Sequence, residues 1–322
     1  MAQLFDDSRL DDEQTLGADE VLRDLAEAGA RVRREAGDAA EAVAAAVAAM
    51  ASEGRPRAVV AAGPDSRLLR AVLEPWCPVP FVAWPGPSLP GWAGALDLVV
   101  VLAPDGSDTG AASAVAEAVR RGCRLVVACA PDSLVGQHAV GRDTTVLPAT
   151  AGDQLAMAVV LLDFLDQLDL GPQTSAEEVA TALDDVAIAC SPYRDLSVNP
   201  AKLLAIALAD GTPLVWGGSV LAARAARRIA ESVRRASGRT ALAADADDGD
   251  LRSVLLVLDD GSDEVPVREQ RTRLEEAAHD HDVRVETVAA TDGEAVARYA
   301  ALLATGTWAS AYLRVGLGRS QR

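Results

Sequence analysis

The chain has 322 residues, enough for one large domain or for two domains of ordinary size. Half of the residues are hydrophobic but only 3% are aromatic, so alanine, valine and leucine must fill the core. The formal net charge of −18 argues against nucleic acid as a partner, because its phosphate backbone requires clusters of lysine and arginine. The negative charge of the chain would also repel an anionic ligand at long range, so any phosphate site needs hydrogen-bond donors or positive charges close to the phosphate.

Several classes of site have no signature in the sequence. The four cysteines and three histidines show no metal-ligand spacing, and we predict neither a metal site nor a disulfide framework. Neither G-x-G-x-x-G nor a P-loop occurs, so no cofactor is predicted. The acidic first residues lack the basic and apolar regions of a signal peptide, and no apolar stretch indicates a membrane span. We expect a cytoplasmic chain without membrane contact.

Helical and strand patterns alternate from about residue 19 onward, and residues 1–18 are predicted to form a polar N-terminal arm. Short runs rich in valine and alanine lie between amphipathic stretches, which is typical of strands and helices that alternate around a parallel sheet. In the first half we predict helices over 19–35, 38–53, 65–75, 109–121 and 153–168, and strands over 57–62, 78–83, 98–103, 123–130 and 144–147.

The stretch from Asp97 to Ala130 gives the clearest structural signal. Its first apolar run, Leu98 to Ala103, is rich in valine and is followed by Pro104 and Gly106. This pattern is typical of a strand that is buried on both faces of a parallel sheet. A helical pattern and a second apolar run follow, so we predict a right-handed βαβ unit.

The second half repeats the alternation after a break at Gly171 to Thr174, and we place a domain boundary near residue 170. The predicted domains are therefore 19–170 and 171–322. Each is expected to be an α/β domain with a mainly parallel sheet flanked by helices. In the second half we predict helices over 174–190, 220–237 and 292–315, further helices from Asn199 and up to about His279, and strands over 213–216, 239–244, 251–258 and 283–288.

The loop PDGSDTG, residues 104–110, follows a predicted strand at its carboxyl end, where open α/β sheets place their ligands. Gly106, Ser107 and Thr109 could cradle a phosphate, together with the backbone N–H groups of the following helix. Alternatively, Asp108 or Ser107 is simply the N-cap of that helix, and no ligand is needed. The sequence leaves both interpretations open.

A second glycine turn, formed by Gly217, Gly218 and Ser219, lies between a predicted strand and a predicted helix. Glycine permits the backbone to approach a ligand closely. The alternative is a tight turn that merely lets the helix pack on the sheet. The segment GPDS, residues 63–66, is a weaker version of the same pattern.

The helix predicted over 220–237 carries arginines and one glutamate on a single face. Such a face is either a salt-bridged surface or a cluster that faces a sugar phosphate. Among its residues, Arg228 is a candidate phosphate ligand, and Glu231 is the best-placed carboxylate of the second half for a general base. The face consists of Arg224, Arg227, Arg228 and Glu231.

Four segments of the chain together resemble a known family. Residues 79–127 follow the order of proline-rich loop, strand, Gly/Ser/Thr loop, helix and strand. The tetrapeptide NPAK at 199–202 precedes PLVWGGS, and a helix with Ala-x-Arg pairs follows. Residues 251–318 supply a strand, a helix, a strand and the final helix. From about residue 19 onward, the chain resembles the double sugar-isomerase (SIS) proteins of the bifunctional phosphoglucose/phosphomannose isomerase group.

The resemblance implies two flavodoxin-like SIS domains, a homodimer and a sugar phosphate as ligand. The family interconverts aldose and ketose 6-phosphates through a cis-enediol. Its catalytic set is a glutamate base, a histidine for ring opening and a late lysine. Carried to this chain, it implies that Ser107 and Thr109 bind the phosphate group and that Glu231 is the base.

The chain departs from the family at the catalytic motifs. The phosphate loop reads Asp-Gly-Ser-Asp-Thr where the family has Ser-Gly-Asn-Thr, residues 231–248 hold no histidine, the late lysine is missing, and Arg235 stands nearest to the family's glutamate. One hypothesis is an isomerase of glucose, fructose or mannose 6-phosphate. The alternative is an inactive SIS protein that binds a sugar phosphate and regulates, or partners with, a mannose-metabolising enzyme. A third is a homodimeric scaffold with no ligand.

Overall fold

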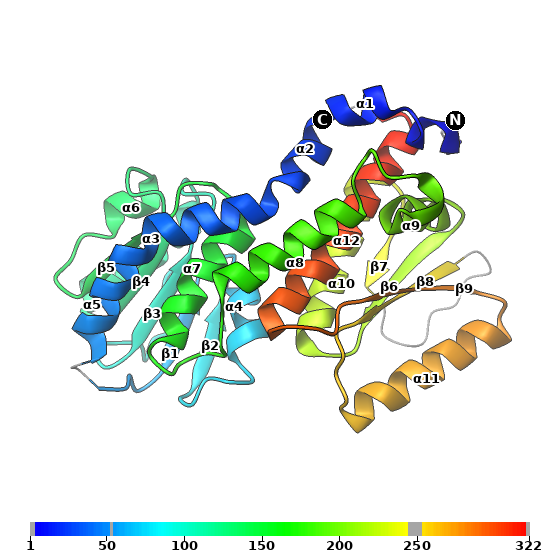
Figure 1. Cartoon of the computed structure of the whole chain (residues 1–322). Coiled ribbons are helices and arrows are strands. Elements are labelled where there is room, and N and C mark those ends of the chain that lie inside the picture. The colour runs from blue at the N-terminus through cyan, green and yellow to red at the C-terminus, as the bar shows by residue number, and fades with distance from the viewer. Residues whose placement is uncertain (1–3, 52–53, 244–252, 320–322) are drawn as a thin grey trace. The chain divides into compact units, whose positions relative to one another are not determined.

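The computed structural model describes residues 4–51, 54–243 and 253–319, which form two compact units (Figure 1). One unit, here called the N-terminal unit, is Ala30–Ala180. The other, the C-terminal unit, combines the residues up to Gly29 with those from Thr181 onward. The limits expected at residues 18 and 170 remain predictions about domain boundaries. The structure adds that the chain ahead of Ala30 groups with the C-terminal half.

The sheet of the N-terminal unit has five parallel strands in the order β2-β1-β3-β4-β5. Val99 of the central strand pairs with Val60 on one side and Leu125 on the other. This order and the all-parallel pairing confirm the α/β fold class predicted from the sequence. The strands are β1 (Val59–Ala62), β2 (Phe81–Trp84), β3 (Leu98–Leu102), β4 (Arg124–Cys129) and β5 (Thr144–Pro148).

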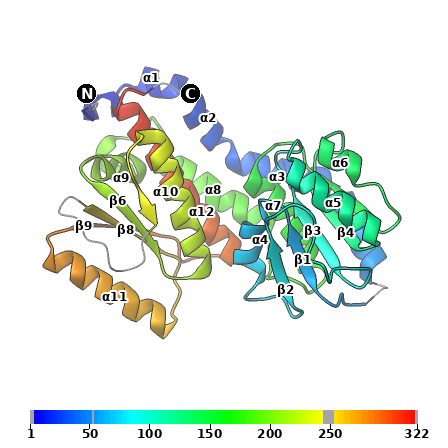
Figure 2. The ribbon, with the colours of Figure 1, turned by 180° about the vertical axis from the view of Figure 1, so that it is seen from behind.

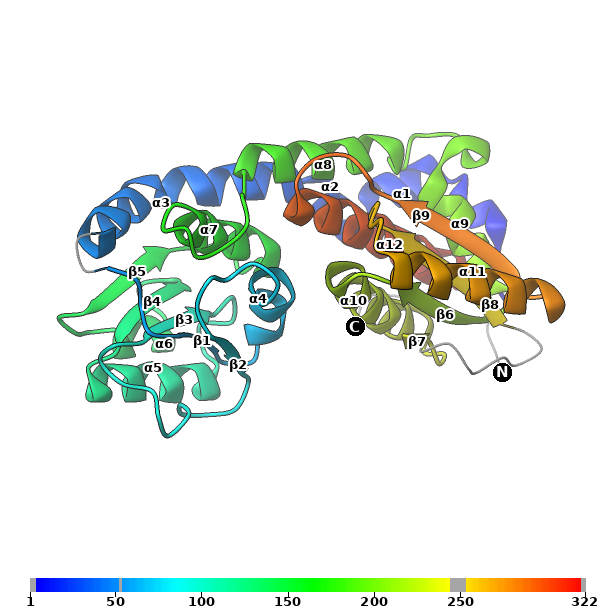
Figure 3. The same cartoon turned by 90° about the horizontal axis from the view of Figure 1, so that it is seen from below.

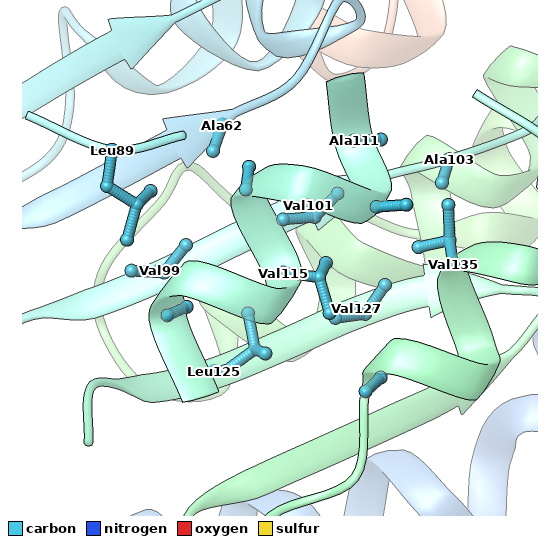
Figure 4. Close-up of a cluster of buried hydrophobic side chains, with 14 of the residues drawn as sticks. Ala62, Leu89, Val99, Val101, Ala103, Ala111, Val115, Leu125, Val127 and Val135 are labelled. Carbon is cyan, nitrogen blue, oxygen red and sulfur yellow. The ribbon is translucent and has the colours of Figure 1, made fainter. Parts of the chain in front are cut away.

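Helices cover both faces of this sheet. On one face, α5 and α6 bury valine and alanine side chains against β3 and β4, as Figure 4 shows for Val101, Val115, Val127 and Val135. On the other face, the largely buried α7 lies between α3 and the strands (Figure 3). The helices of this unit are α3 (Ala28–Ala51), α4 (Ser66–Leu73), α5 (Thr109–Arg121), α6 (Leu134–His138) and α7 (Gln154–Asp166). The next helix, α8 (Ala176–Ala189), begins in this unit and continues into the C-terminal unit.

Local signals set the limits of α5. Asp108 lies in extended conformation ahead of the helix, and its side chain accepts a hydrogen bond from the backbone N–H of Ala111. Gly122 ends the helix with a φ of 65°, a left-handed conformation that glycine adopts without a steric penalty. In contrast, the break predicted between residues 35 and 38 is absent, because α3 continues through Gly37 to Ala51. The helix predicted over 19–35 is instead divided at Glu27, where α2 ends.

A buried ion pair holds the chain at the amino end of β3. Asp97 is fully buried and accepts hydrogen bonds from Nε and Nη2 of Arg57, at 2.9 and 2.6 Å, and from the Gly94 N–H at 2.9 Å. Burial by itself would raise the pKa of Asp97, but the hydrogen bonds from Arg57 and Gly94 outweigh it, so the pKa lies below its usual value. The pair therefore fixes the irregular loop that precedes β3.

The C-terminal unit has a four-stranded parallel sheet in the order β7-β6-β8-β9. Helix α10 lies beside α12 on one face, and α11 covers part of the other, where it buries Leu274 and Ala278 against Trp216 and Val257 (Figure 2). No described helix is long and apolar enough to span a bilayer. The elements are β6 (Thr212–Gly217), β7 (Leu242–Ala243), β8 (Ser253–Asp259), β9 (Arg284–Ala289), α9 (Pro200–Ala209), α10 (Val220–Ser237), α11 (Val265–Asp280) and α12 (Ala295–Gly316).

The segment predicted as a polar arm is folded onto this unit. It forms a 3-10 turn, Asp7–Leu10, then α1 (Glu13–Ala18), and α2 (Glu20–Ala26) follows. Leu10 and Leu16 are fully buried, and Arg314 of α12 donates a hydrogen bond to Asp19 at 2.5 Å. The segment is therefore more than a polar arm: its 3-10 turn, which contains Leu10, contacts α12 far along the chain, and the Asp6 N–H donates to the Gly316 carbonyl at the end of that helix.

We predict that Asp97→Asn lowers the free energy of unfolding of the N-terminal unit by about 2 kcal/mol, because a hydrogen-bonded buried charge is lost. Since the folded pKa of Asp97 is depressed, its contribution is present above the unfolded pKa of about 3.9 and is lost as the pH falls through the folded pKa. Urea unfolding at pH 7 and pH 3, followed by tryptophan fluorescence, measures both effects. Asp143→Asn, an exposed change of the same charge, is the control, and an equal loss in both variants would contradict the prediction.

A second prediction concerns the N-terminal segment. Leu10→Ala should lower the free energy of unfolding of the C-terminal unit by about 2–4 kcal/mol, because it removes a fully buried side chain and leaves a cavity. Leu4→Ala is the matched control, since Leu4 is 91% exposed. Thermal unfolding followed by circular dichroism measures the difference. If both variants melt at the wild-type temperature, the segment does not stabilise the unit.

Candidate functional site

The strand order places one favoured ligand position on each sheet. In open parallel sheets, ligands bind outside the carboxyl ends of the strands at the point where the strand order reverses. In the N-terminal unit this point lies between β1 and β3, and in the C-terminal unit between β6 and β8. The loops that follow these four strands are therefore the candidate site residues of each unit.

Three loops meet at this edge of the N-terminal unit. Gly63, after β1, has a φ of 89°, and a Cβ there would lie 3.5 Å from the Cβ of Ala111 in α5. Gly106, after β3, leaves no room for a Cβ because the Ser133 side chain fills that space. The Gly106 carbonyl also accepts a hydrogen bond from the Val135 N–H at 3.0 Å. The loop after β3 is thus held by the start of α6, independently of any ligand.

Carboxylates of this loop accept hydrogen bonds from its own donors. Asp105 Oδ1 accepts from the Ser107 N–H at 3.0 Å and from Ser107 Oγ at 2.6 Å. These hydrogen bonds hold the pKa of Asp105 below its usual value. Asp108 accepts from the Ala111 N–H at 2.6 Å, which confirms the N-cap interpretation for Asp108. Thr109 is the first residue of α5 and is exposed.

One buried hydroxyl at the same edge has no such partner. Ser66, the first residue of α4, is fully buried, and its Oγ finds no hydrogen-bond partner among the residues that the structure describes. Buried polar groups are rarely left without a partner unless water or a ligand serves them. The sequence pattern GPDS marked this turn, but it did not single out Ser66.

In the C-terminal unit, packing accounts for the glycine turn. A Cβ at Gly217 would overlap Ala222 of α10, and one at Gly218 would overlap Val267 of α11. Ser219 caps α10 by accepting a hydrogen bond from the Ala222 N–H at 3.0 Å, and its hydroxyl donates to Asp260. The tight-turn interpretation therefore suffices for the two glycines, and their contact with a ligand remains a prediction.

The two units share a tetrapeptide at equivalent positions. Residues 105–108, after β3, and residues 260–263, after β8, both read Asp-Gly-Ser-Asp. Asp260 Oδ1 accepts a hydrogen bond from the Ser262 N–H at 3.2 Å, as Asp105 does from Ser107. Sequence reasoning missed this repeat, although a direct comparison of the two loops would have found it.

The predicted base lies away from this edge. Glu231 accepts hydrogen bonds from Arg228, at 3.4 Å, and from Arg235, which are neighbours on the same helix. It is eleven residues after Val220, where α10 begins, so it lies roughly 16 Å along the helix axis from the Ser219 turn. The structure therefore brings Glu231 together with Arg228 but not with Gly217, Gly218 and Ser219.

The NPAK segment forms a buried structural cluster instead of an exposed site. Asn199 caps α9, and the Lys202 ammonium donates to the carbonyls of Pro192 and Arg194 at 2.9 and 3.0 Å. Burial lowers the pKa of Lys202, although nearby acidic groups oppose this shift. The Lys202 Nζ also lies 5.7 Å from the centre of the Tyr312 ring. The cluster thus fixes the irregular segment that precedes α9.

The C-terminal part of the chain is similar to a known family of domains. Residues 197–319 match the family of bacterial phospho-glucose isomerase C-terminal SIS domains. A comparison with curated proteins gives no match.

Solved structures cover most of the chain. A candidate tagatose-6-phosphate ketose/aldose isomerase from Clostridium novyi is 12% identical, with a TM-score of 0.67 and coverage of 92% of this chain and 89% of that chain. The C-terminal domain of glucosamine-fructose-6-phosphate aminotransferase from Francisella tularensis is 12% identical, with a TM-score of 0.61 and coverage of 90% and 97%. A glucose-6-phosphate isomerase-like protein from Thermus thermophilus is 17% identical, with a TM-score of 0.51 and coverage of 81% of each chain.

At these identities the likeness establishes the fold. The strand order of both sheets, the SIS match of residues 197–319 and the solved structures agree with one another. This chain is therefore an α/β protein with an SIS-like fold, similar in architecture to phosphosugar isomerases.

Proposed function

We propose that this chain binds a hexose 6-phosphate at the β1/β3 edge of the N-terminal unit and does not isomerise it. The observation that carries the proposal is the buried Ser66 hydroxyl, which has no partner among the described residues and lies at the start of α4, in the turn that follows Gly63. Phosphate oxygens accept hydrogen bonds from hydroxyl and backbone N–H groups at helix N-termini. The Ser66 and Thr109 hydroxyls are the candidate donors there, and the donors of Ser107 become available when Asp105 is displaced.

The absence of turnover follows from the surroundings of the predicted base. Aldose–ketose isomerisation needs a base within hydrogen-bond reach of the sugar's C1 and C2 atoms. Glu231 instead accepts hydrogen bonds from Arg228 and Arg235, midway along α10. A protein of this kind would act by binding a sugar phosphate, and a mannose-metabolising enzyme is the class of partner that we propose for it. By the family resemblance, we also propose that it is a homodimer.

A second candidate is an active hexose-6-phosphate isomerase. The match of residues 197–319 to phospho-glucose isomerase SIS domains favours it. In that case Glu231 is the base, Ser107 and Thr109 hold the phosphate group, and the turn at 217–219 and Arg228 contact the sugar. Fixed donors at the edge would then stabilise the developing oxyanion.

The two candidates differ in turnover. We expect fructose 6-phosphate to raise the melting temperature of the full chain, with a stabilisation of about 2.7 kcal/mol at 100 times its dissociation constant, whereas fructose does not. Proton NMR of the same mixture in D2O should show no glucose 6-phosphate, no mannose 6-phosphate and no exchange of the C1 hydrogens of fructose 6-phosphate with deuterium. Turnover that Glu231→Gln abolishes would establish the isomerase instead. If the chain neither binds nor turns over any hexose 6-phosphate, both candidates are wrong, and the hypothesis of a homodimeric scaffold without a ligand remains.

Ser66→Ala provides a test within the site. Its hydroxyl has no partner among the described residues, so its removal should leave the melting temperature unchanged or slightly higher. The dissociation constant for fructose 6-phosphate, measured by calorimetry, should rise about tenfold, because one hydrogen bond to the phosphate group is lost. A stable variant that binds as tightly as the wild type would remove Ser66 from the site.

A further inference from the structure

We infer that Asp105 is a specificity-determining residue, whose carboxylate competes with the phosphate group of the ligand for the donors of Ser107 and so weakens the binding of anionic sugars. This inference rests on the proposed function, and it concerns the selectivity of the same site. Four observations lead to it.

The first observation is that Asp105 already accepts the hydrogen bonds that a phosphate would need from Ser107. A phosphate at the loop after β3 would take hydrogen bonds from backbone N–H and hydroxyl groups there. In the structure, Asp105 Oδ1 already accepts from both the Ser107 N–H, at 3.0 Å, and Ser107 Oγ, at 2.6 Å. A phosphate can gain these donors only by displacing the carboxylate.

The second observation is the charge. The hydrogen bonds from Ser107 keep the pKa of Asp105 low, so the group is a carboxylate at neutral pH. A phosphate bound to Ser107 would lie beside this like charge, which disfavours the anionic ligand. A neutral sugar carries hydroxyl donors and meets no such repulsion. Asp105 thus weakens the binding of a sugar phosphate more than the binding of a neutral sugar.

The third observation is that the loop does not depend on Asp105 for its shape. Its backbone is fixed by the Val135 N–H on the Gly106 carbonyl, at 3.0 Å, and by close packing of Gly106 on Ser133. Asp108 caps α5 separately. The loop should therefore persist when the Asp105 side chain is removed, with the donors of Ser107 released.

The fourth observation is the repeat in the C-terminal unit. Asp260 stands where Asp105 does, at the corresponding edge, and accepts hydrogen bonds from the Ser262 N–H and from the Ser219 hydroxyl. Both units thus place a carboxylate on the donors of the turn after the third strand of the sheet. An aspartate at both equivalent edges supports a role at the edge itself.

Calorimetry on the full chain tests the inference with fructose 6-phosphate, fructose and inorganic phosphate as probes. Asp105→Ala should lower the dissociation constants for fructose 6-phosphate and for inorganic phosphate at least tenfold, and fructose should bind measurably to neither the wild type nor the variant. Asp105→Asn, which keeps an acceptor for Ser107 but removes the charge, should give a smaller gain. Asp143→Asn, an exposed change of the same charge at the amino end of β5, should give none. The gain should shrink in high salt, because exposed charges are screened.

The outcomes separate this inference from the proposed function. If the wild type binds fructose 6-phosphate and both Asp105 variants, checked by circular dichroism to be folded, bind it equally or more weakly, Asp105 only shapes the loop and the inference fails alone. If only the Asp105 variants bind fructose 6-phosphate, the proposed function is wrong for the natural chain, and Asp105 is shown to exclude the anion from this edge. If Asp143→Asn gains as much as Asp105→Ala, the effect is one of net charge, and the inference is wrong. If no variant binds any phosphate ester, the proposed function fails and the inference with it.

Discussion

The constraint that shapes both candidate site edges is the burial of the central strands of each sheet. β3 and most of β8 are shielded from solvent on both faces, so helices must pack on either side of each sheet. In a parallel sheet, the strands all end at the same edge, and β1 and β3 leave it through loops that lead into α4 and α5. The loops after β1 and β3 therefore come together without being neighbours in sequence. Gly63 and Ala111 lie in contact for this reason.

Local signals allowed much of this fold to be predicted. The limits of α5 and α10 follow from a side-chain cap at one end and a left-handed glycine at the other, and both helices have the bounds expected from the sequence. The N-terminal segment could not be predicted in this way. Leu10 stands among acidic residues, and the turn that contains it packs against α12, about three hundred residues later. The burial of this segment is determined by tertiary contacts and not by its local sequence.

The candidate site shows the same limit on a smaller scale. The sequence located the loops at 104–110 and 217–219, because glycine and serine after an apolar run are a local pattern. It could not tell whether a glycine serves a ligand or a neighbouring side chain, since Val267 meets Gly218 only through packing of a distant helix. Nor could it show that Ser107 donates to Asp105 or that Ser66 lacks a partner. Such facts depend on side-chain geometry.

The two Asp-Gly-Ser-Asp turns are alike in sequence but differ in their access to a ligand. In the C-terminal unit, Arg271 donates to Asp259, and Arg298 donates to the carbonyl of Asp260, each at 2.5 Å. Asp260 is half-buried and both of its carboxylate oxygens accept hydrogen bonds, so this turn is fixed and compensated. Asp105 is exposed, and its known partner is Ser107 alone within the turn. Displacing the exposed Asp105 carboxylate from its partner costs less free energy than displacing the half-buried Asp260 carboxylate, which accepts hydrogen bonds at both oxygens. The edge of the N-terminal unit is therefore the one at which an incoming anion meets less resistance.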